Sequence, residues 1–436
     1  MALKIERVLA WEALDSRGTP TVACAISLAG GAEGQAAVPS GASTGSHEAH
    51  ELRDGGSRFG GKGVRSAVAA VNGEIAQALR GGDAGDQEAT DDLLRHLDGT
   101  PTLERLGANA VLAVSTACAL AAADAHGLPL WRYLAAEEGP PLLPLPMVNV
   151  LSGGAHAGGL IDVQDVLVVP VGAGSFAEAI EWAARIRAAA VDVFRERGNS
   201  GALVADEGGL AAALSSNREA ITVVAAAIER SGLVPGEQVA IAVDVAATQF
   251  QEGADYRFAV EDRSLRRDEL VAELRSWCDE YPIVSVEDPV GEDDTDGWKL
   301  ASERLADVQL LGDDLFVTST ERLAAGIANG IANAVLVKPN QVGTLSDTRR
   351  LIELARSAGY ATVLSARSGD TEDSWLADLA VGWRTGQLKV GSTTRSERTA
   401  KWNRLLRLES EYAEARFAGR EVLAPAQDFT AAMLRP

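Results

Sequence analysis

The feature that most constrains this fold is a repeated alternation, after about residue 139, of short apolar runs with longer stretches of helical periodicity. Alternation of this kind predicts parallel strands joined by helices. So many repeats favour a closed α/β barrel over an open, doubly wound sheet, and no Gly-rich dinucleotide-binding motif follows the first run. The runs are Val166–Val169, Val239–Val243, Ile283–Val286, Val308–Leu311, Ala334–Val337, Thr362–Leu364 and the weaker Gln387–Val390.

The chain before residue 139 has a different pattern, in which predicted strands come first and helices follow. The Pro-rich segment Gly139–Pro146 is interpreted as a linker between domains. With 436 residues in all, we expect a smaller α+β domain over 1–138 and a barrel over 139–436. The predicted elements of the first domain are strands over Ile5–Leu14, Pro20–Leu28 and Gly34–Val38, helices over 63–80 and 86–97, and a buried helix over 107–126.

The net charge of −22 argues against nucleic acid and anionic membranes as partners. The same charge repels an anionic substrate, so a phosphate site has to be built locally from cations, backbone N–H groups or metal. Cys24, Cys118 and Cys278 lie far apart, which suits a reducing compartment and argues against disulfides. Without a signal-peptide pattern or an uninterrupted membrane-spanning run, we expect a cytoplasmic protein.

Carboxylates follow three successive predicted strands, at Asp244, Glu287 and Asp313, and Lys338 follows the next strand. Barrel enzymes carry their chemistry where the strands end. For one such carboxylate a helix cap is the simpler interpretation. Three close carboxylates need a cation to stay ionised, and an oxygen-only set suits Mg²⁺.

Proton transfer in this barrel falls to lysines and carboxylates, because every histidine lies before residue 157. A nearby divalent cation would depress the pKa of Lys338 and Lys389, although each could also be an ordinary solvated lysine. Glu207 follows a predicted strand over Ala202–Val204 and stands beside a Gly-Gly turn, which makes it a candidate acid. His156 lies in a Gly-rich loop, where contact with a ligand is favoured.

Collinear motifs over essentially the whole chain resemble those of the enolase family. The matching stretches are SGASTG (40–45), HELRDG and GGKGV (within 50–64), LGANAVLAVS (106–115), GGAHAG (153–158), DEGG (206–209), VDVAAT (243–248), VSVEDP (284–289), GDDL (312–315), VKPNQVGTL (337–345), RSGDTEDS (367–374) and RSERTAKWNRLLR (395–407). The resemblance implies an enolase-type modified TIM barrel with a smaller α+β N-terminal domain. It also implies a homodimer or higher homo-oligomer, and conversion of 2-phosphoglycerate to phosphoenolpyruvate.

The resemblance also implies roles for individual residues. A lysine or histidine base working with Mg²⁺ is general in enolase-superfamily sites. The implied metal ligands are Asp244, Glu287 and Asp313, with Ser40 helping to hold a second Mg²⁺ and closing over the substrate. The implied base is Lys338 and the implied acid is Glu207, with Lys389 at the substrate carboxylate, Arg367 and Ser368 at the phosphate, and His156, Gln164 and Asp165 on the closing loops.

Two positions depart from the family pattern. Ala366 stands where family members have a histidine before the Arg–Ser pair, and Asp165 follows Gln164 where they have a glutamate. Losing a catalytic donor commonly costs ~10²-fold in rate. The favoured hypothesis is therefore a specialised paralogue resembling carboxyphosphonoenolpyruvate synthase of phosphonate-antibiotic pathways. An ordinary glycolytic enolase and a non-catalytic enolase-fold binding protein are the alternatives.

Overall fold

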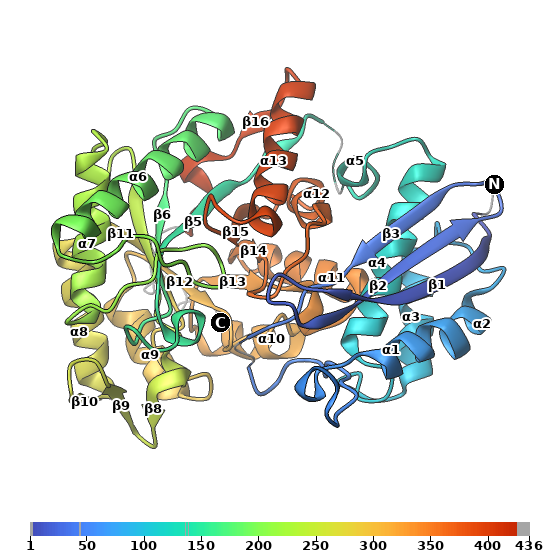
Figure 1. Cartoon of the computed structure of the whole chain (residues 1–436), viewed down its shortest axis with the longest axis horizontal. Coiled ribbons are helices and arrows are strands. Elements are labelled where there is room, and N and C mark those ends of the chain that lie inside the picture. The colour runs from blue at the N-terminus through green and yellow to red at the C-terminus, as the bar shows by residue number, and fades with distance from the viewer. Residues whose placement is uncertain (1–2, 43–44, 136, 138, 425–436) are drawn as a thin grey trace, which may run out of the picture.

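The computed structural model describes residues 3–42, 45–135, 137 and 139–424, and shows a small domain packed beside a barrel (Figure 1). The predicted boundary residue 138 and the end of the predicted second domain lie outside the described residues, as do Ser43 and Thr44 of the SGASTG motif.

The small domain is built on an antiparallel sheet of β1 (Ile5–Leu14), β2 (Pro20–Leu28) and β3 (Glu33–Ala37), in that order. The predictions for the first two strands are confirmed, and the third begins one residue earlier than predicted. The helices of this domain are α1 (Arg65–Ala70), a π-helical turn (Val71–Ile75), α2 (Ala76–Leu79), α3 (Gln87–Asp98), α4 (Ala108–Ala125) and α5 (Leu130–Tyr133).

Helix α4 is the core of the small domain. It is long and apolar enough to cross a membrane, but 83% of its apolar window is buried inside the protein, as in the core helix of a soluble domain. It packs on β2 and β3, and its backbone lies close to Gly34 of β3. A Cβ atom there would overlap backbone atoms of Ala117 and Ala121, so this helix–sheet contact requires a glycine.

Eight strands close the barrel in the order β11-β12-β13-β14-β15-β5-β6-β7. Strand β6 is antiparallel to both of its neighbours, and the other pairs are parallel. Two successive helices, α6 (Phe176–Glu196) and α7 (Asn217–Arg230), connect β6 to β7, so the chain re-enters the sheet from the end at which it left. The strands are β5 (Leu145–Ser152), β6 (Asp165–Val169), β7 (Ala240–Asp244), β11 (Ile283–Glu287), β12 (Gln309–Gly312), β13 (Ala334–Val337), β14 (Ala361–Ser365) and β15 (Gly386–Gly391).

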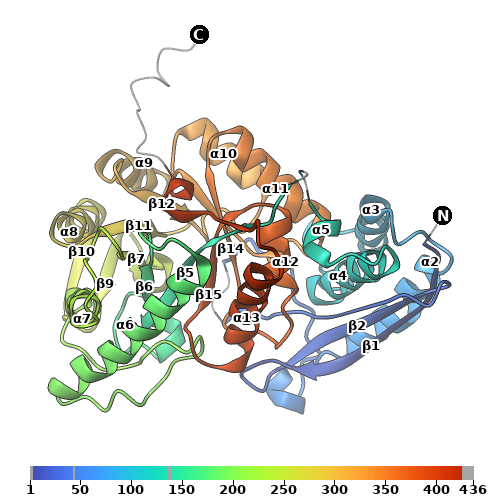
Figure 2. The ribbon, with the colours of Figure 1, turned by 90° about the horizontal axis from the view of Figure 1, so that it is seen from above.

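Helices surround this barrel, as seen from above in Figure 2. They are α6 (Phe176–Glu196), α7 (Asn217–Arg230), α8 (Arg267–Glu280), α9 (Thr295–Arg304), α10 (Thr320–Asn329), α11 (Leu345–Ser357), α12 (Trp375–Gly382) and α13 (Ser396–Glu411). The short strands are β4 (Leu142–Leu143), β8 (Gln251–Glu252), β9 (Asp255–Phe258), β10 (Arg263–Arg266) and β16 (Arg416–Phe417). The short 3₁₀ turns are Arg58–Gly61, Gly154–Ala157, Ala247–Phe250, Pro339–Gln341 and Gly419–Val422.

Three sequence predictions in the barrel are wrong. The first is that all of its strands are parallel, since β6 is antiparallel to both neighbours. Strand β5 begins at Leu145, inside the segment that we interpreted as a linker because of its prolines. The predicted strand over Ala202–Val204 does not form. Val204 makes only an isolated bridge to Leu210, within the turn that carries Glu207.

The tight packing of β3 on α4 can be tested by substitution. Gly34→Ala should lower the free energy of unfolding by about 1–3 kcal/mol, because the added methyl group overlaps the helix backbone. Gly30→Ala is the matched control, since no atom lies within 4 Å of its added Cβ. Urea unfolding midpoints measure both variants, and equal midpoints would contradict the close contact.

Candidate active site

The barrel brings five predicted residues to one mouth, at the carboxyl ends of its parallel strands. Asp244 and Glu287 are the last residues of β7 and β11, and Asp313 and Lys338 directly follow β12 and β13. Lys389 lies inside β15. All five side chains are buried, so their charges must be balanced by one another or by a ligand.

Lysines and carboxylates at the mouth pair directly. The Lys389 Nζ atom lies 2.7 Å from Asp244 Oδ2 and 2.8 Å from Glu287 Oε2, and Lys338 Nζ contacts Asp313 Oδ2. Burial acts against both ammonium groups, but the neighbouring carboxylates outweigh it and raise the pKa of both lysines. The protein's own charges therefore act against the depressed lysine pKa that we predicted for a site beside a cation.

The buried glutamate has features of a metal ligand. Burial, and then the charge of Asp244, raise the pKa of Glu287 well above its ordinary value. Its Oε1 atom is buried and has no hydrogen-bond partner among the described residues. A buried carboxylate oxygen without a donor is costly, and an oxygen-only donor set suits a hard cation. The residues at the mouth therefore fit Mg²⁺.

Two groups at the barrel mouth have ligand atoms that all lie within 4.8 Å of one another. One is Asp288, Asp313 and Asp314, and the other is His156, Asp165 and Glu207. The predicted triad of Asp244, Glu287 and Asp313 is not one of these compact groups, although Asp313 belongs to the first.

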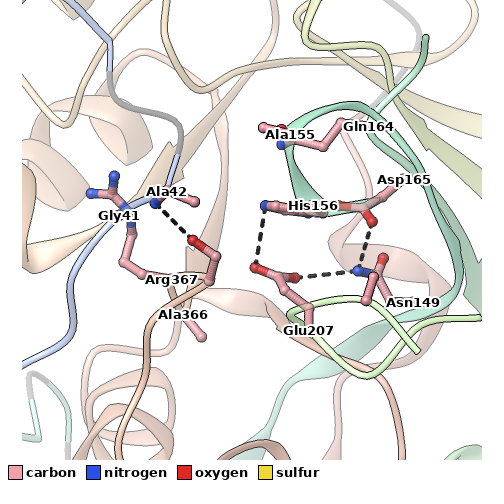
Figure 3. A network of polar contacts seen from close by, with 12 residues as sticks. Gly41, Ala42, Asn149, Ala155, His156, Gln164, Asp165, Glu207, Ala366 and Arg367 are labelled. Carbon is pink, nitrogen blue, oxygen red and sulfur yellow. Dashed lines mark hydrogen bonds and ion pairs between the residues drawn. The ribbon is translucent and has the colours of Figure 1, made fainter. Parts of the chain in front are cut away.

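The second group is closed into a ring by Asn149 (Figure 3). The Asn149 Nδ2 atom donates to Asp165 Oδ1 at 2.9 Å and to Glu207 Oε2 at 3.2 Å. His156 Nδ1 lies 2.9 Å from Asp165 Oδ2, and His156 Nε2 lies 3.8 Å from Glu207 Oε1. Asp165 therefore reaches the histidine although its side chain is one methylene shorter than glutamate.

Charge in this ring favours a protonated histidine. Burial lowers the pKa of His156, but the charges of Asp165 and Glu207 outweigh it and raise the value to about 9. Burial also raises the pKa of Asp165. Asn149 is a site residue that the sequence analysis missed, because it lies in β5, the strand that was not recognised. Gln164 joins this side of the site to the carboxylates, since its Nε2 atom donates to Asp244 Oδ2 at 3.0 Å.

The predicted phosphate-binding pair lies against the small domain. Arg367 donates to both oxygens of Glu48, at 2.9 and 3.2 Å, and to Asn340 Oδ1 at 3.1 Å. Ser368 Oγ accepts a hydrogen bond from the Ala42 backbone N–H at 2.8 Å. Both residues are buried, and hydrogen bonds with Glu48 and Ala42 of the small domain orient their side chains.

The hydrogen bonds described for Ser40 do not include Asp244, Glu287 or Asp313, the predicted metal ligands. Its hydroxyl accepts hydrogen bonds from Arg53 at 2.9 Å and Arg17 at 3.3 Å, and donates to Glu51 at 3.2 Å. Two backbone hydrogen bonds, of 2.7 and 3.0 Å, join Ser40 to Gly369 beside the phosphate-binding pair. The structure therefore places Ser40 near the predicted phosphate site, and its role at a second metal stays a prediction.

One small pocket gathers most of the predicted residues. It is lined by His156, Gln164, Glu207, Lys338, Ser365, Ala366, Arg367, Ser368 and Lys389. Asp165 is not part of this lining and acts from behind His156.

Family models match both parts of the chain. The model described as the enolase N-terminal domain matches residues 5–134, and the model described as the enolase C-terminal TIM barrel domain matches residues 140–426. The chain belongs to the enolase family. It is therefore an enolase-superfamily enzyme, and its barrel mouth holds an acidic cluster that can bind a metal.

The raised pKa of His156 can be measured by NMR in metal-free buffer. We expect the imidazole to titrate at about pH 9, above its ordinary 6.5. Protonation of His156 therefore stabilises the fold fully below about pH 6.5, and this stability is lost as the pH rises through about 9. Asp165→Asn should lower the pKa, because it removes the charge nearest to the ring. A value at or below 6.5 in the unmodified protein would contradict the ring of contacts.

Metal binding at the mouth can be tested with a single matched pair of variants. Mg²⁺ should raise the melting temperature of the unmodified protein, since a ligand of the folded state stabilises it. Glu287→Gln should remove most of this increase, because it replaces a buried carboxylate ligand with a neutral amide. Glu303→Gln, on the exposed surface of α9, should keep the full increase. Equal shifts in both variants would rule out Glu287 as a ligand.

Proposed function

We propose that this enzyme removes the α-proton of 2-phosphoglycerate, or of a close analogue, to form an enolpyruvyl product. Lys338 is the base, and Glu207 is the acid that assists the departing group. The observation that carries this proposal is that both line one pocket with Lys389, Arg367 and Ser368. A base, an acid and cations for a carboxylate and a phosphate are the groups that this chemistry needs.

The substrate in this proposal is a small phosphorylated carboxylate. Because the chain carries a net charge of −22, affinity for such an anion must come from local cations. Arg367 and Ser368 hold the phosphate, and Lys389 faces the carboxylate. His156, Gln164 and Asp165 line the side at which the group departs. Glu48 shares Arg367 with the phosphate, because it already accepts two hydrogen bonds from that guanidinium.

In the same proposal, Asp244, Glu287 and Asp313 hold Mg²⁺, and Ser40 helps to hold a second ion. Bound there, Mg²⁺ would supply positive charge for the substrate carboxylate and compete with Lys338 for Asp313. Lys338 can accept a proton only as a neutral amine, whereas Asp313 favours its ammonium form. The strength of the contact between Lys338 and Asp313 therefore determines how readily Lys338 becomes the neutral amine that can accept a proton.

Within this chemistry, we favour a specialised paralogue that resembles carboxyphosphonoenolpyruvate synthase and takes a larger phosphorus-bearing group. Support comes from the part of the pocket lining that contains Ala366. Ser365 and Ala366 line both the pocket with Lys338 and a neighbouring pocket that contains Trp375 and Lys401. A methyl group at this position offers no side-chain donor to either pocket.

An ordinary enolase is the second candidate. It is favoured by Asp165, which keeps its contacts with His156 and Asn149 despite being shorter than glutamate. In either case we propose a homodimer or a higher homo-oligomer, and exposed Leu9 and Leu14 on β1 are consistent with a further contact surface.

Two assays separate the candidates. With 2-phosphoglycerate and Mg²⁺ alone, we expect only a trace of phosphoenolpyruvate, and Ala366→His should raise this rate about a hundredfold by restoring a donor. With a nucleotide-activated phosphonoformate as co-substrate, the unmodified protein should form the carboxyphosphono product. Lys338→Met should abolish both reactions. An enolase-like rate from the unmodified protein, with no gain from Ala366→His, would favour the ordinary enolase.

A further inference from the structure

Lys338 and Asp313 belong to a buried ring of hydrogen bonds that two neutral residues complete. The Lys338 backbone N–H donates to Thr318 Oγ1 at 2.9 Å. The Thr318 hydroxyl donates to Gln341 Oε1 at 2.6 Å, and Gln341 Nε2 donates to Asp313 Oδ1 at 3.1 Å. The contact of Lys338 Nζ with Asp313 Oδ2 closes the ring.

The direction of each hydrogen bond in the ring is determined by chemistry. The Lys338 backbone N–H can only donate, so the single hydroxyl hydrogen of Thr318 is left for Gln341. Gln341 must then present its carbonyl oxygen to Thr318 and its amide nitrogen to the carboxylate of Asp313. Thr318 and Gln341 are each 1% exposed. Water is therefore excluded, and loss of one member leaves its neighbours unsatisfied.

Backbone strain marks the same place. Val317 has φ 41° and Thr318 has φ 58°, a region that β-branched residues strongly avoid. Strain of this kind persists only where the surrounding structure over-determines a position, and it gathers at functional sites. The strained pair lies between Asp313, after β12, and α10, so the strain falls on the segment that delivers the Thr318 hydroxyl to the ring.

Gln341 also links the ring to the predicted phosphate site. Its Nε2 atom lies 3.3 Å from Glu48 Oε1, and Glu48 accepts both hydrogen bonds from Arg367 that were described above. One amide group thus touches the carboxylate that holds the base and the carboxylate that holds the phosphate-binding arginine.

We propose that Thr318 and Gln341 are positioning residues that set the orientation of the Lys338 amine and the Asp313 carboxylate. This inference rests on the proposed role of Lys338 as the base. The Thr318 hydroxyl fixes the backbone from which Lys338 projects, and the Gln341 amide fixes one oxygen of Asp313 so that the other faces Lys338.

The test compares Thr318→Val, which keeps the shape but removes the hydroxyl, with Thr318→Ser, which keeps the hydroxyl. The measured step is loss of deuterium from 2-deutero-2-phosphoglycerate into water with Mg²⁺, which reports proton removal whatever product follows. Thr318→Val should lower the maximal rate roughly tenfold or more, because a misplaced base loses near-attack geometry. Its KM should stay within about twofold, since substrate contacts are untouched. Thr318→Ser should retain the rate.

The proposal is overturned if Thr318→Val keeps the unmodified rate, or if Thr318→Ser falls equally far. It is also overturned if Thr318→Val changes only KM or melting temperature, which is the outcome of a merely structural role. If Thr318→Val does not fold, Gln341→Met breaks the same ring from its other member and should also lower the maximal rate roughly tenfold or more. Its KM is no criterion, because Gln341 also contacts Glu48. An unmodified maximal rate in Gln341→Met would overturn the proposal.

The deuterium-release assay on the unmodified protein separates failure of the proposed function from failure of the positioning role. If the unmodified protein releases no deuterium, the proposed proton removal from 2-phosphoglycerate is wrong. The ring is then tested through Asp313, with Mg²⁺ affinity measured by thermal-shift titration. Thr318→Val should weaken Mg²⁺ binding roughly tenfold, as loss of a group that orients a ligand typically does, and Thr318→Ser should not. Equal affinities would overturn the positioning role.

Discussion

The structure of this site depends on pairing between buried lysines and buried carboxylates at the barrel mouth. Lys389 lies between Asp244 and Glu287, and Lys338 meets Asp313. Isolated charges in such a place would cost several kcal/mol each, so neither set could be buried without the other. Barrel closure meets this condition, because it brings the ends of β7, β11, β12, β13 and β15 to one mouth. A cation that enters the mouth competes with the lysines for the same carboxylate oxygens. Metal binding and the protonation state of Lys338 therefore depend on each other.

The small domain completes the site rather than merely covering it. Backbone hydrogen bonds join Ser40 to Gly369, the Ala42 N–H donates to Ser368, and Glu48 holds Arg367. Arg367 and Ser368, the predicted phosphate-binding pair, therefore each have a partner from the small domain. Helix α4 gives this domain its own buried core, which supports residues 40–42 and 45–51 beside the site.

Much of this arrangement follows from the sequence, and the exceptions have physical causes. Seven apolar runs predicted seven of the barrel strands, and the carboxylates or lysine that follow four of them predicted Asp244, Glu287, Asp313 and Lys338 at the mouth. The eighth strand, β5, was partly assigned to a linker because of its prolines, and Asn149 was lost with it. The antiparallel direction of β6 depends on two consecutive helices, which alternation alone does not predict. Thr318 carried no signal, and Gln341 stood out only as part of the VKPNQVGTL motif, because a neutral polar residue shows its role only through its neighbours. The enolase family is established, whereas the product depends on side-chain contacts around Ala366 that a sequence pattern cannot resolve.

The central claim is that the divalent cation binds to Asp244, Glu287 and Asp313, next to both lysines. The most direct measurement is an anomalous difference map from crystals soaked in Mn²⁺, which replaces Mg²⁺ at oxygen sites and scatters anomalously. The account predicts one strong peak in contact with a carboxylate oxygen of each of the three residues. A peak at Asp288, Asp313 and Asp314, or at His156, Asp165 and Glu207, would contradict it and move the chemistry to another part of the mouth.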